Sequence, residues 1–405
     1  MQKSLFVSFA VVMFLVSAAG QPMSAAGGKW GLEDVVFKDS RGNEVTIPGG
    51  AKSCAVKVVK FTKGVPWTTN PKAMDPQDIL GTPDYNPTDL NHLTLGNNGV
   101  VVLEFGVYIY DGPGNDIYVF EVGPDVEATK VEVSSDLVNW IYVGDANGSI
   151  SGVDMNGKVP ADGRYKYVRL TDLVTVKGGG TPGADIDAVA GINVTPYEYS
   201  GGAKAELEKA HELNIISDVF FGADLKKPIT RAEFAAVSVK LYENLTGKKA
   251  APALRNPFTD TKDAEVLKAY NTGLMAGTLA NKFSPDVPLN REQAVTILVH
   301  VLKAASLPGW TPATDNQFTL NFKQPAKFAD DDKISEWAKP SVYFAAANNI
   351  IPDTDSTKTF SPRATTTAEE AANYAIATRE LAITMAVRMV DNLKGKPLDY
   401  EKIKK

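Results

Sequence analysis

The sequence predicts a two-domain protein: an all-β sandwich of the jelly-roll type over residues 30–198, then a mainly α-helical bundle of three repeats. In the first part, short runs rich in β-branched and aromatic residues alternate with Gly-, Pro- and Asp-rich turns. From residue 203 onward the apolar residues recur with the period of a helix. One helix-start pattern then occurs three times, which indicates an internal repeat.

The first 26 residues have the composition of a secretory signal. An apolar run over residues 5–16 follows a lysine, and small residues continue to Ala26. The run is too short to cross a membrane, and no later run is long enough. We therefore expect residues 1–26 to be removed on export and no integral membrane segment to remain.

The composition argues against nucleic acid as a partner and against most enzyme classes. A net charge of −6 and a pI near 5.3, without a basic arm, do not fit a nucleic-acid-binding protein. The three histidines, His92, His211 and His300, are too far apart to indicate a zinc site. We expect no enzyme activity. A carboxylate pair for glycoside hydrolysis stays open, because separation in space decides it.

The N-terminal domain carries two kinds of sequence signal. Residues 131–136, with Asn139 and Trp140 after them and residues 167–170 further on, resemble the galactose-binding-like (discoidin-type) jelly rolls. This resemblance implies an architecture rather than a ligand. Trp140 could stack on a sugar, but its place in a strand pattern predicts that it belongs to the core. Strands are expected at 56–61, 100–105, 117–122, 130–134 and 167–170.

Carboxylates in two segments of this domain suggest calcium. If the two segments meet in space, their hard oxygen ligands suit this ion, so Ca²⁺ is the one cofactor to consider. Alternatively, Asp and Gly simply form turns there. The candidate ligands are Asp111, Asn115, Asp116, Glu121, Asp185 and Asp187.

The repeated pattern in the second domain is a helix start that carries an arginine. Thr230 and Glu233 have the spacing of a capping box, and Arg231 falls at the first helical position. A cation is disfavoured there by the helix dipole, so an anion beside it is expected. The pattern recurs with Asn290, Arg291 and Gln293, and again with Thr367, Ala368 and Glu370.

These repeats resemble the S-layer homology module, whose hallmark is a Thr-Arg-Ala-Glu helix start. Further matches are the module openings at residues 258–260 and 328–330 and the Phe-Ser-Pro loops at 283–285 and 360–362. The resemblance implies that three modules pack about a pseudo-threefold axis. It also implies that the grooves between them bind a secondary cell-wall polysaccharide through an acidic, pyruvylated sugar.

Carried over to this chain, the resemblance gives a set of glycan-binding residues. The arginines would meet the sugar carboxylate, since a planar guanidinium suits it better than a lysine. Alternatively, they form surface ion pairs. Ala368 in the third repeat, and the missing opening motif in the first, predict one or two working grooves. The candidates are Arg231, Arg291, Gly277, Asp260, Asp330 and Trp337.

The remaining segments connect or extend the domains. The repeats are expected at 205–247, 256–304 and 326–390, with a loop insertion at 306–324. A flexible linker is expected at 199–204, and a solvated basic tail at 391–405.

Together these features predict a secreted, non-catalytic protein of the bacterial cell wall or S-layer, anchored to an anionic secondary cell-wall polysaccharide and displaying the β domain. One alternative is a calcium-dependent carbohydrate-binding adhesin that acts through the β domain. Others are a wall-bound glycoside hydrolase using Asp185 and Asp187, and a β domain that self-associates into a lattice.

Overall fold

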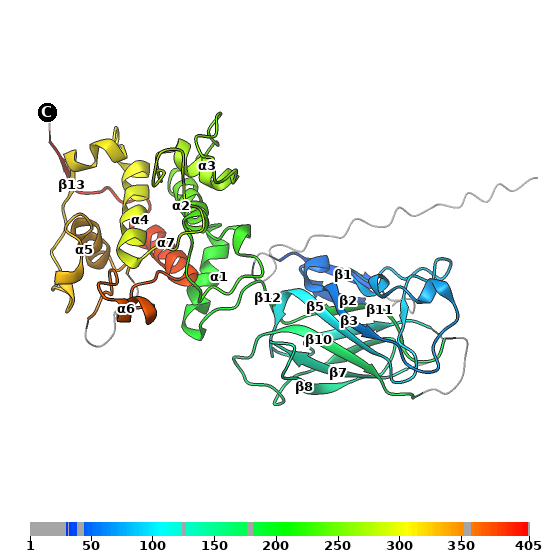
Figure 1. The fold of residues 1–405 in the computed structure, drawn as a ribbon. Helices are drawn as coiled ribbons and strands as arrows, with labels where there is room; N and C mark the ends of the chain where they lie inside the picture. The colour runs from blue at the N-terminus through cyan, green and yellow to red at the C-terminus, as the bar shows by residue number, and fades with distance from the viewer. Residues whose placement is uncertain are drawn as a thin grey trace, which may run out of the picture.

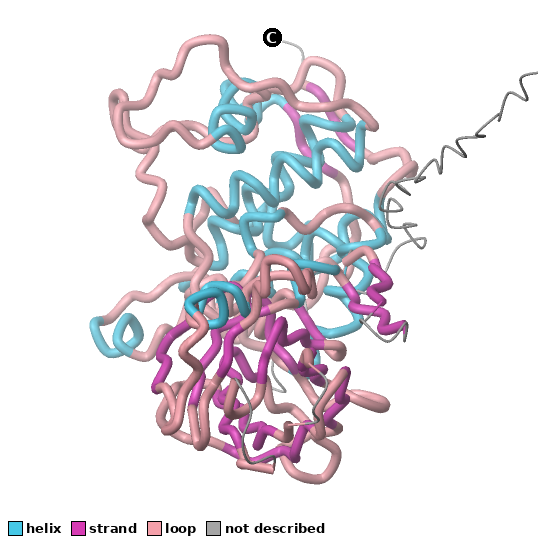
Figure 2. The backbone as a smooth tube through the Cα atoms, turned by 90° about the vertical axis from the view of Figure 1, so that its right-hand side faces the viewer, coloured by secondary structure: helices cyan, strands magenta, loops and turns pink. Residues whose placement is uncertain are grey.

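The computed structural model describes residues 30, 32–38, 44–123, 127–175, 181–351 and 358–403. Strands gather in one part of the molecule and helices in the other, which confirms the predicted two-domain fold class (Figures 1 and 2). The predicted signal segment, 1–26, lies outside the described residues. None of the described helices is both long and apolar enough to cross a membrane.

The N-terminal domain is a sandwich of two antiparallel sheets, and the five expected strands are all present. The larger sheet has the order β12 (Val194–Thr195), β5 (Val100–Ile109), β10 (Tyr165–Asp172), β7 (Thr129–Ser134) and β8 (Ile141–Ala146), with β3 (Ala55–Thr62) also on β5. The smaller sheet has the order β4 (Leu93–Thr94), β11 (Asp185–Gly191), β6 (Ile117–Glu121) and β9 (Ile150–Val153).

Burial along the strands explains why these runs pair as they do. In β5, Val101, Leu103 and Phe105 are fully buried between the sheets, as the two-residue period of a strand requires. Strand β11 is buried along its whole length. The hairpin of β1 (Asp34–Lys38) and β2 (Glu44–Pro48) packs apolar side chains against it and so covers the smaller sheet.

The C-terminal domain consists of three long helices, each preceded by a shorter one. Each shorter helix packs against the long helix of the neighbouring repeat, and the contact of the first with the last closes a ring. The long helices are α2 (Arg231–Thr246), α4 (Arg291–Ser306) and α7 (Arg379–Leu393); the shorter ones are α1 (Lys204–Glu212), α3 (Ala264–Asn271) and α5 (Lys339–Ala347).

Three backbone hydrogen bonds define the pseudo-threefold axis of this ring. The N–H of Ile229 donates to the carbonyl of Ala377 (2.9 Å), and that of Ala377 donates to the carbonyl of Leu289 (3.0 Å). The N–H of Leu289 donates back to the carbonyl of Ile229 (3.1 Å). Each of these residues directly precedes a helix N-cap, so the three helix starts meet at one place.

The third helix start lies later than the sequence predicted. Thr366, not Thr367, caps the helix there, and that helix, α6 (Thr367–Ala371), has only five residues. The long helix α7 begins at Arg379 behind the cap Thr378. Local spacing does not reveal this shift. Ala368 follows the proline of its Phe-Ser-Pro loop by 368 − 362 = 6 residues, and Arg291 follows the corresponding proline of the second repeat by 291 − 285 = 6.

Residues 199–204 do not form the flexible linker that we expected. The backbone N–H and the hydroxyl of Ser200 both donate to the Glu380 carboxylate, each at 3.0 Å. Tyr199 is buried, with its ring centroid 5.4 Å from that of Trp30. The His211 ring, in α1, lies edge to face with that of Trp30, with the centroids 5.9 Å apart. The domains are therefore joined by a packed aromatic junction.

The C-terminal tail is mostly exposed, as expected of a solvated end, but its residues 400–402 are also held in place. Strand β14 (Tyr400–Lys402) pairs antiparallel with β13 (Phe318–Leu320), which belongs to the insertion at 306–324. The Lys402 ammonium lies 4.8 Å from the centroid of the Phe318 ring. The insertion and the tail thus support each other.

The junction predicts a pH dependence of stability. Burial lowers the pKa of His211 to about 4, and its Nε2 has no hydrogen-bond partner among the described residues. An unfolded histidine titrates near 6.5, so between pH 6.5 and 4 the unfolded state binds the extra proton and stability falls as the pH falls.

We therefore expect the free energy of unfolding of the wild type, relative to His211→Phe, to drop by about 2 kcal/mol between pH 7 and pH 4.5. Urea unfolding at several pH values measures this difference. Burial raises the pKa of Asp187 to about 7 and acts in the opposite direction, but it does so in both proteins and cancels. A pH-independent difference would contradict the prediction.

Candidate functional site

Arg231 is held across the boundary between the first and second repeats. Thr230 and Glu233 form the predicted capping box at the start of α2. The guanidinium donates from Nε to the carbonyl of Phe283 (2.9 Å) and from Nη2 to that of Ala276 (2.8 Å). It also lies 4.8 Å from the centroid of the Phe283 ring. The side chain is therefore fixed in one orientation, with Nη1 unused by these bonds.

The charge of Arg231 has no counterion among the described residues. Its partners are carbonyl oxygens, and burial lowers the pKa of its guanidinium. A partly desolvated cation of this kind gains most from a carboxylate that binds its open edge. Within the described part of the chain, Arg231 therefore does not form the surface ion pair that was the alternative to ligand binding.

Arg231 lines a cleft of about 400 Å³. Gly277, a predicted contact, lies on its wall, where a Cβ would come within 2.6 Å of the Lys282 carbonyl oxygen. Glycine is thus required there by the close approach of the chain's own backbone. The other lining residues are Tyr270, residues 273–276, Ile297, His300 and Pro312.

The aspartates of the module openings act on the protein itself. Asp260 accepts hydrogen bonds from the N–H groups of Phe283 (3.0 Å) and Ser284 (2.9 Å). Asp330 does the same for the Phe-Ser pair of its own repeat, at 2.9 and 2.8 Å. Asp260 therefore positions the carbonyl that holds Arg231, and neither aspartate lines the Arg231 cleft.

Arg291 is a second cation of the same type. It begins α4, and its guanidinium lies 5.5 Å from the centroid of the Phe360 ring. Burial lowers its pKa, while the Asp330 carboxylate acts in the opposite direction. Its Nε is buried without a hydrogen-bond partner among the described residues. Arg291 lines a cleft of about 290 Å³, together with Glu206, Thr384 and Arg388 among others.

Sequence reasoning missed the third arginine of the set. Arg379 occupies the first position of α7, as Arg231 and Arg291 do in their helices. It is bound to Glu233, with Nη2 at 2.7 Å and Nε at 3.1 Å, and it donates from Nη1 to the Asp224 carbonyl. Its charge is used to lock the third repeat to the first. The Thr378-Arg379 pair was the signal that could have revealed it.

Trp337 lies outside both arginine clefts. It is 56% exposed, between a short 3-10 helix (Asp331–Lys333) and α5. The structure does not bring it together with the other predicted glycan-binding residues.

The predicted calcium ligands fall into two groups instead of one. Strands β6 and β11 run antiparallel, with Ile117 opposite Gly191 and Glu121 opposite Ile186. Asp116, before β6, and Asp185, at the start of β11, therefore lie at opposite ends of the ladder. The prediction of one converged site was wrong, because it did not include strand direction.

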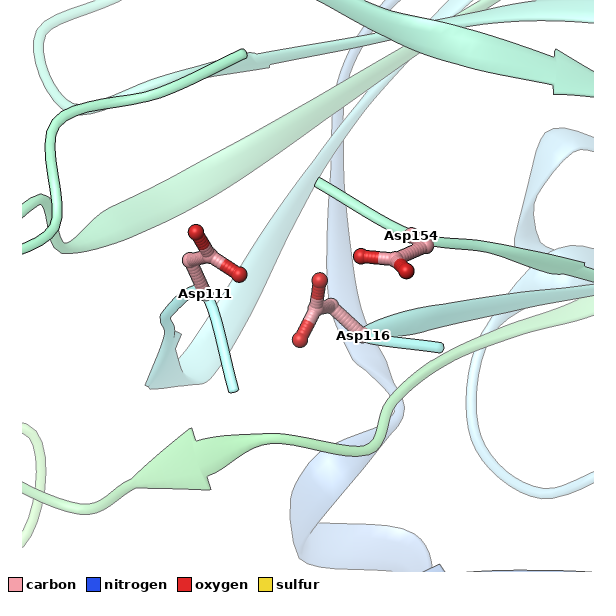
Figure 3. A group of neighbouring side chains, drawn as sticks. All are labelled: Asp111, Asp116 and Asp154. Carbon is pink, nitrogen blue, oxygen red and sulfur yellow. The ribbon is translucent and has the colours of Figure 1, made fainter. Parts of the chain in front are cut away.

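At the end of the ladder near Asp116, three carboxylates meet. Asp111, Asp116 and Asp154 offer oxygens that all lie within 4.8 Å of one another, and the side chains point toward each other (Figure 3). Asp154 was not predicted. Asp116 is buried and accepts from the N–H groups of Gly112 (2.9 Å) and Met155 (2.8 Å). The side-chain amide of Asn115 donates a hydrogen bond to the Tyr118 hydroxyl (3.2 Å).

At the other end, Asp185 and Asp187 are less than a tenth exposed. Asp185 accepts from the Thr94 hydroxyl at 2.5 Å, and Asp187 from the N–H of Asp84 at 3.4 Å. Glu121, also buried, lies at this end as well. These contacts hold the loop before β4 on β11.

The carboxylate trio gives a metal test. Calcium takes six to eight oxygens, so three carboxylates would need carbonyl or water oxygens in addition. We expect millimolar calcium to raise the melting temperature by about 2–4 °C through binding to the folded state. Asp154→Asn should abolish this rise and Asp162→Asn, an exposed control, should keep it. An equal rise in all three proteins, measured by scanning calorimetry, would count against the site.

Comparisons with known proteins found solved structures and one family model that match parts of this chain. Among solved structures, the C-terminal domain of a chitobiase from Bacteroides fragilis is 13% identical with a TM-score of 0.23, covering 34% of this chain and 94% of that one. CBM32-3 from a family 31 glycoside hydrolase of Clostridium perfringens is 14% identical with a TM-score of 0.22, covering 35% and 97%. CBM32 of AlyQ, in complex with 4,5-unsaturated mannuronic acid, is 12% identical with a TM-score of 0.22 and the same coverage.

A comparison with curated proteins finds no match. The family model of the S-layer homology domain matches residues 257–295 and 327–372, within the second and third helical repeats. These two segments therefore match the S-layer homology domain, the family that the helix-start motifs predicted.

Proposed function

We propose that this chain is a non-catalytic bacterial cell-surface protein, which its S-layer homology repeats hold on an anionic secondary cell-wall polysaccharide and which displays the β sandwich. The observation that carries the proposal is the Arg231 guanidinium, fixed at the edge of a cleft without a counterion among the described residues. On this proposal residues 1–26 direct export, and the bound carboxylate is that of a pyruvylated sugar.

The cleft has the size and the chemistry for one acidic sugar. Its volume of about 400 Å³ falls in the range of small-molecule sites, roughly 300–1,000 Å³. Tyr270, 40% exposed, offers an aromatic surface to a sugar ring. The fixed guanidinium loses little side-chain entropy on binding.

The three equivalent arginines support two binding clefts at most. Arg231 and Arg291 have no ion pair among the described residues, whereas Arg379 is neutralised by Glu233. Breaking that pair to bind a ligand would leave a partly buried carboxylate uncompensated. We therefore assign polysaccharide binding to the first two arginines.

A second candidate function is glycan binding by the β domain. Trp140, expected in the core, is half-buried on the sheet surface, with the Arg169 guanidinium 4.4 Å from its ring. Tyr142 in β8 is 47% exposed. Aromatic rings beside charged groups suit sugar stacking. Loss of glycan-array binding in Tyr142→Ala, with wall binding unchanged, would support this function.

Wall binding tests the main proposal. Arg231→Ala removes a charge-assisted contact worth about 1.5–3 kcal/mol, so we expect affinity for isolated wall sacculi to fall about 10- to 100-fold. The double variant with Arg291→Ala should be released further. Arg255→Ala, an exposed arginine outside both clefts, is the control.

The contribution of the polysaccharide to binding is tested with cell walls from which it has been removed. Sacculi stripped of the secondary polysaccharide, or of its acidic substituent, should bind the wild type as weakly as intact sacculi bind the double variant. Retention that is unchanged both in the arginine variants and on stripped walls would refute the proposal.

A further inference from the structure

The insertion at 306–324 contributes one residue to the lining of the Arg231 cleft. Pro312, the first residue of a 3-10 helix (Pro312–Gln317), lines the cleft directly. The same helix leads into β13, which β14 holds in place. A segment that looked like a spacer between two repeats in the sequence is therefore part of the candidate binding site.

The insertion also fixes His300, a cleft residue of α4. The Asp315 carboxylate lies 3.4 Å from His300 Nε2 and accepts hydrogen bonds from Lys303 Nζ (2.6 Å) and Trp310 Nε1 (2.7 Å). The His300 ring also lies 5.4 Å from that of Trp310, centroid to centroid. Burial raises the pKa of Asp315, but its hydrogen bonds with His300, Lys303 and Trp310 lower it overall.

An ionised Asp315 decides which nitrogen of His300 carries the proton. The carboxylate can only accept, so the proton of the neutral imidazole belongs on Nε2. Nδ1 is then left as a hydrogen-bond acceptor. Such an acceptor matches a sugar hydroxyl, whereas Arg231 can only donate and matches a carboxylate.

The equivalent positions in the other repeats show that this arrangement belongs to one cleft. His300 stands nine residues after Arg291, as Lys240 does after Arg231 and Arg388 after Arg379 (300 − 291 = 240 − 231 = 388 − 379). Arg388 is paired with Glu206 at 2.8 Å, and Lys240 reaches Asn214 at 3.4 Å. Both are cations, and neither is oriented by an inserted segment.

We propose that the Arg231 cleft recognises an acidic sugar at two points, with Arg231 on its carboxylate and His300, oriented by Asp315, on one of its hydroxyls. This inference rests on the proposed function and adds a second, specificity-determining contact in one of its two clefts. The insertion makes this cleft selective for a sugar acid over a simple carboxylate. Asp315 is a positioning residue, since it acts through His300.

The test uses three probes on the full chain: D-glucuronate, D-glucose and acetate, titrated in NMR or calorimetric experiments. The wild type should bind glucuronate at least fivefold more tightly than acetate, and glucose only weakly. Arg231→Ala should lose affinity for both glucuronate and acetate. His300→Phe should lower affinity for glucuronate about 3- to 10-fold, the range for one hydrogen bond, and leave affinity for acetate unchanged.

Further variants separate hydrogen bonding from folding. His300→Gln retains an acceptor and should recover part of the glucuronate affinity, and it also serves if His300→Phe does not fold. Asp315→Asn should reduce the preference for glucuronate over acetate and leave acetate binding intact. Lys240→Ala, at the equivalent position outside this cleft, should match the wild type.

The outcomes distinguish this inference from the proposed function. Equal glucuronate affinity in the wild type and in both His300 variants would overturn two-point recognition, even if Arg231→Ala still releases the protein from walls. A wild type that binds glucuronate no better than acetate would overturn it as well. Wall binding that is unchanged both in the arginine variants and on stripped walls would instead refute the proposed function.

Discussion

The cycle of three backbone hydrogen bonds through Ile229, Leu289 and Ala377 is the constraint on which the helical domain depends. It joins segments about 60 and 90 residues apart and aligns three helix starts. The N–H groups of Arg231, Arg291 and Arg379 form a second cycle in the opposite sense, each donating to a carbonyl four positions before the next arginine of the ring. These donors would otherwise lack partners at a helix N-terminus. Each arginine side chain consequently faces the neighbouring repeat.

Equivalent positions in this ring have acquired different electrostatic roles. Arg379 meets Glu233, and the pair stabilises the closure between the last repeat and the first. Arg231 meets carbonyl oxygens and a phenylalanine ring, which orient the guanidinium but leave its charge uncompensated. The same local motif thus serves structure in one repeat and fits ligand binding in another, and the partner across the boundary decides which.

The segments outside the ring are packed onto it. The aromatic junction around Trp30 and His211 packs the β sandwich against α1. The insertion and the tail form a small sheet that supports the wall of the Arg231 cleft. Both arrangements depend on apolar burial between segments that are distant in the sequence, and composition alone described them as a linker and a tail.

The sequence by itself determined the domain order, the five expected strands, the capping boxes at Thr230 and Asn290, and the arginines behind them, because period, turn residues and caps act over a few neighbouring residues. Tertiary structure decided which arginine is neutralised, since Arg379 and Glu233 are 146 residues apart. It also decided which carboxylates meet, because strand direction separates Asp116 from Asp185 and brings Asp154 in. Charge compensation depends on distance in space, which local sequence patterns do not contain.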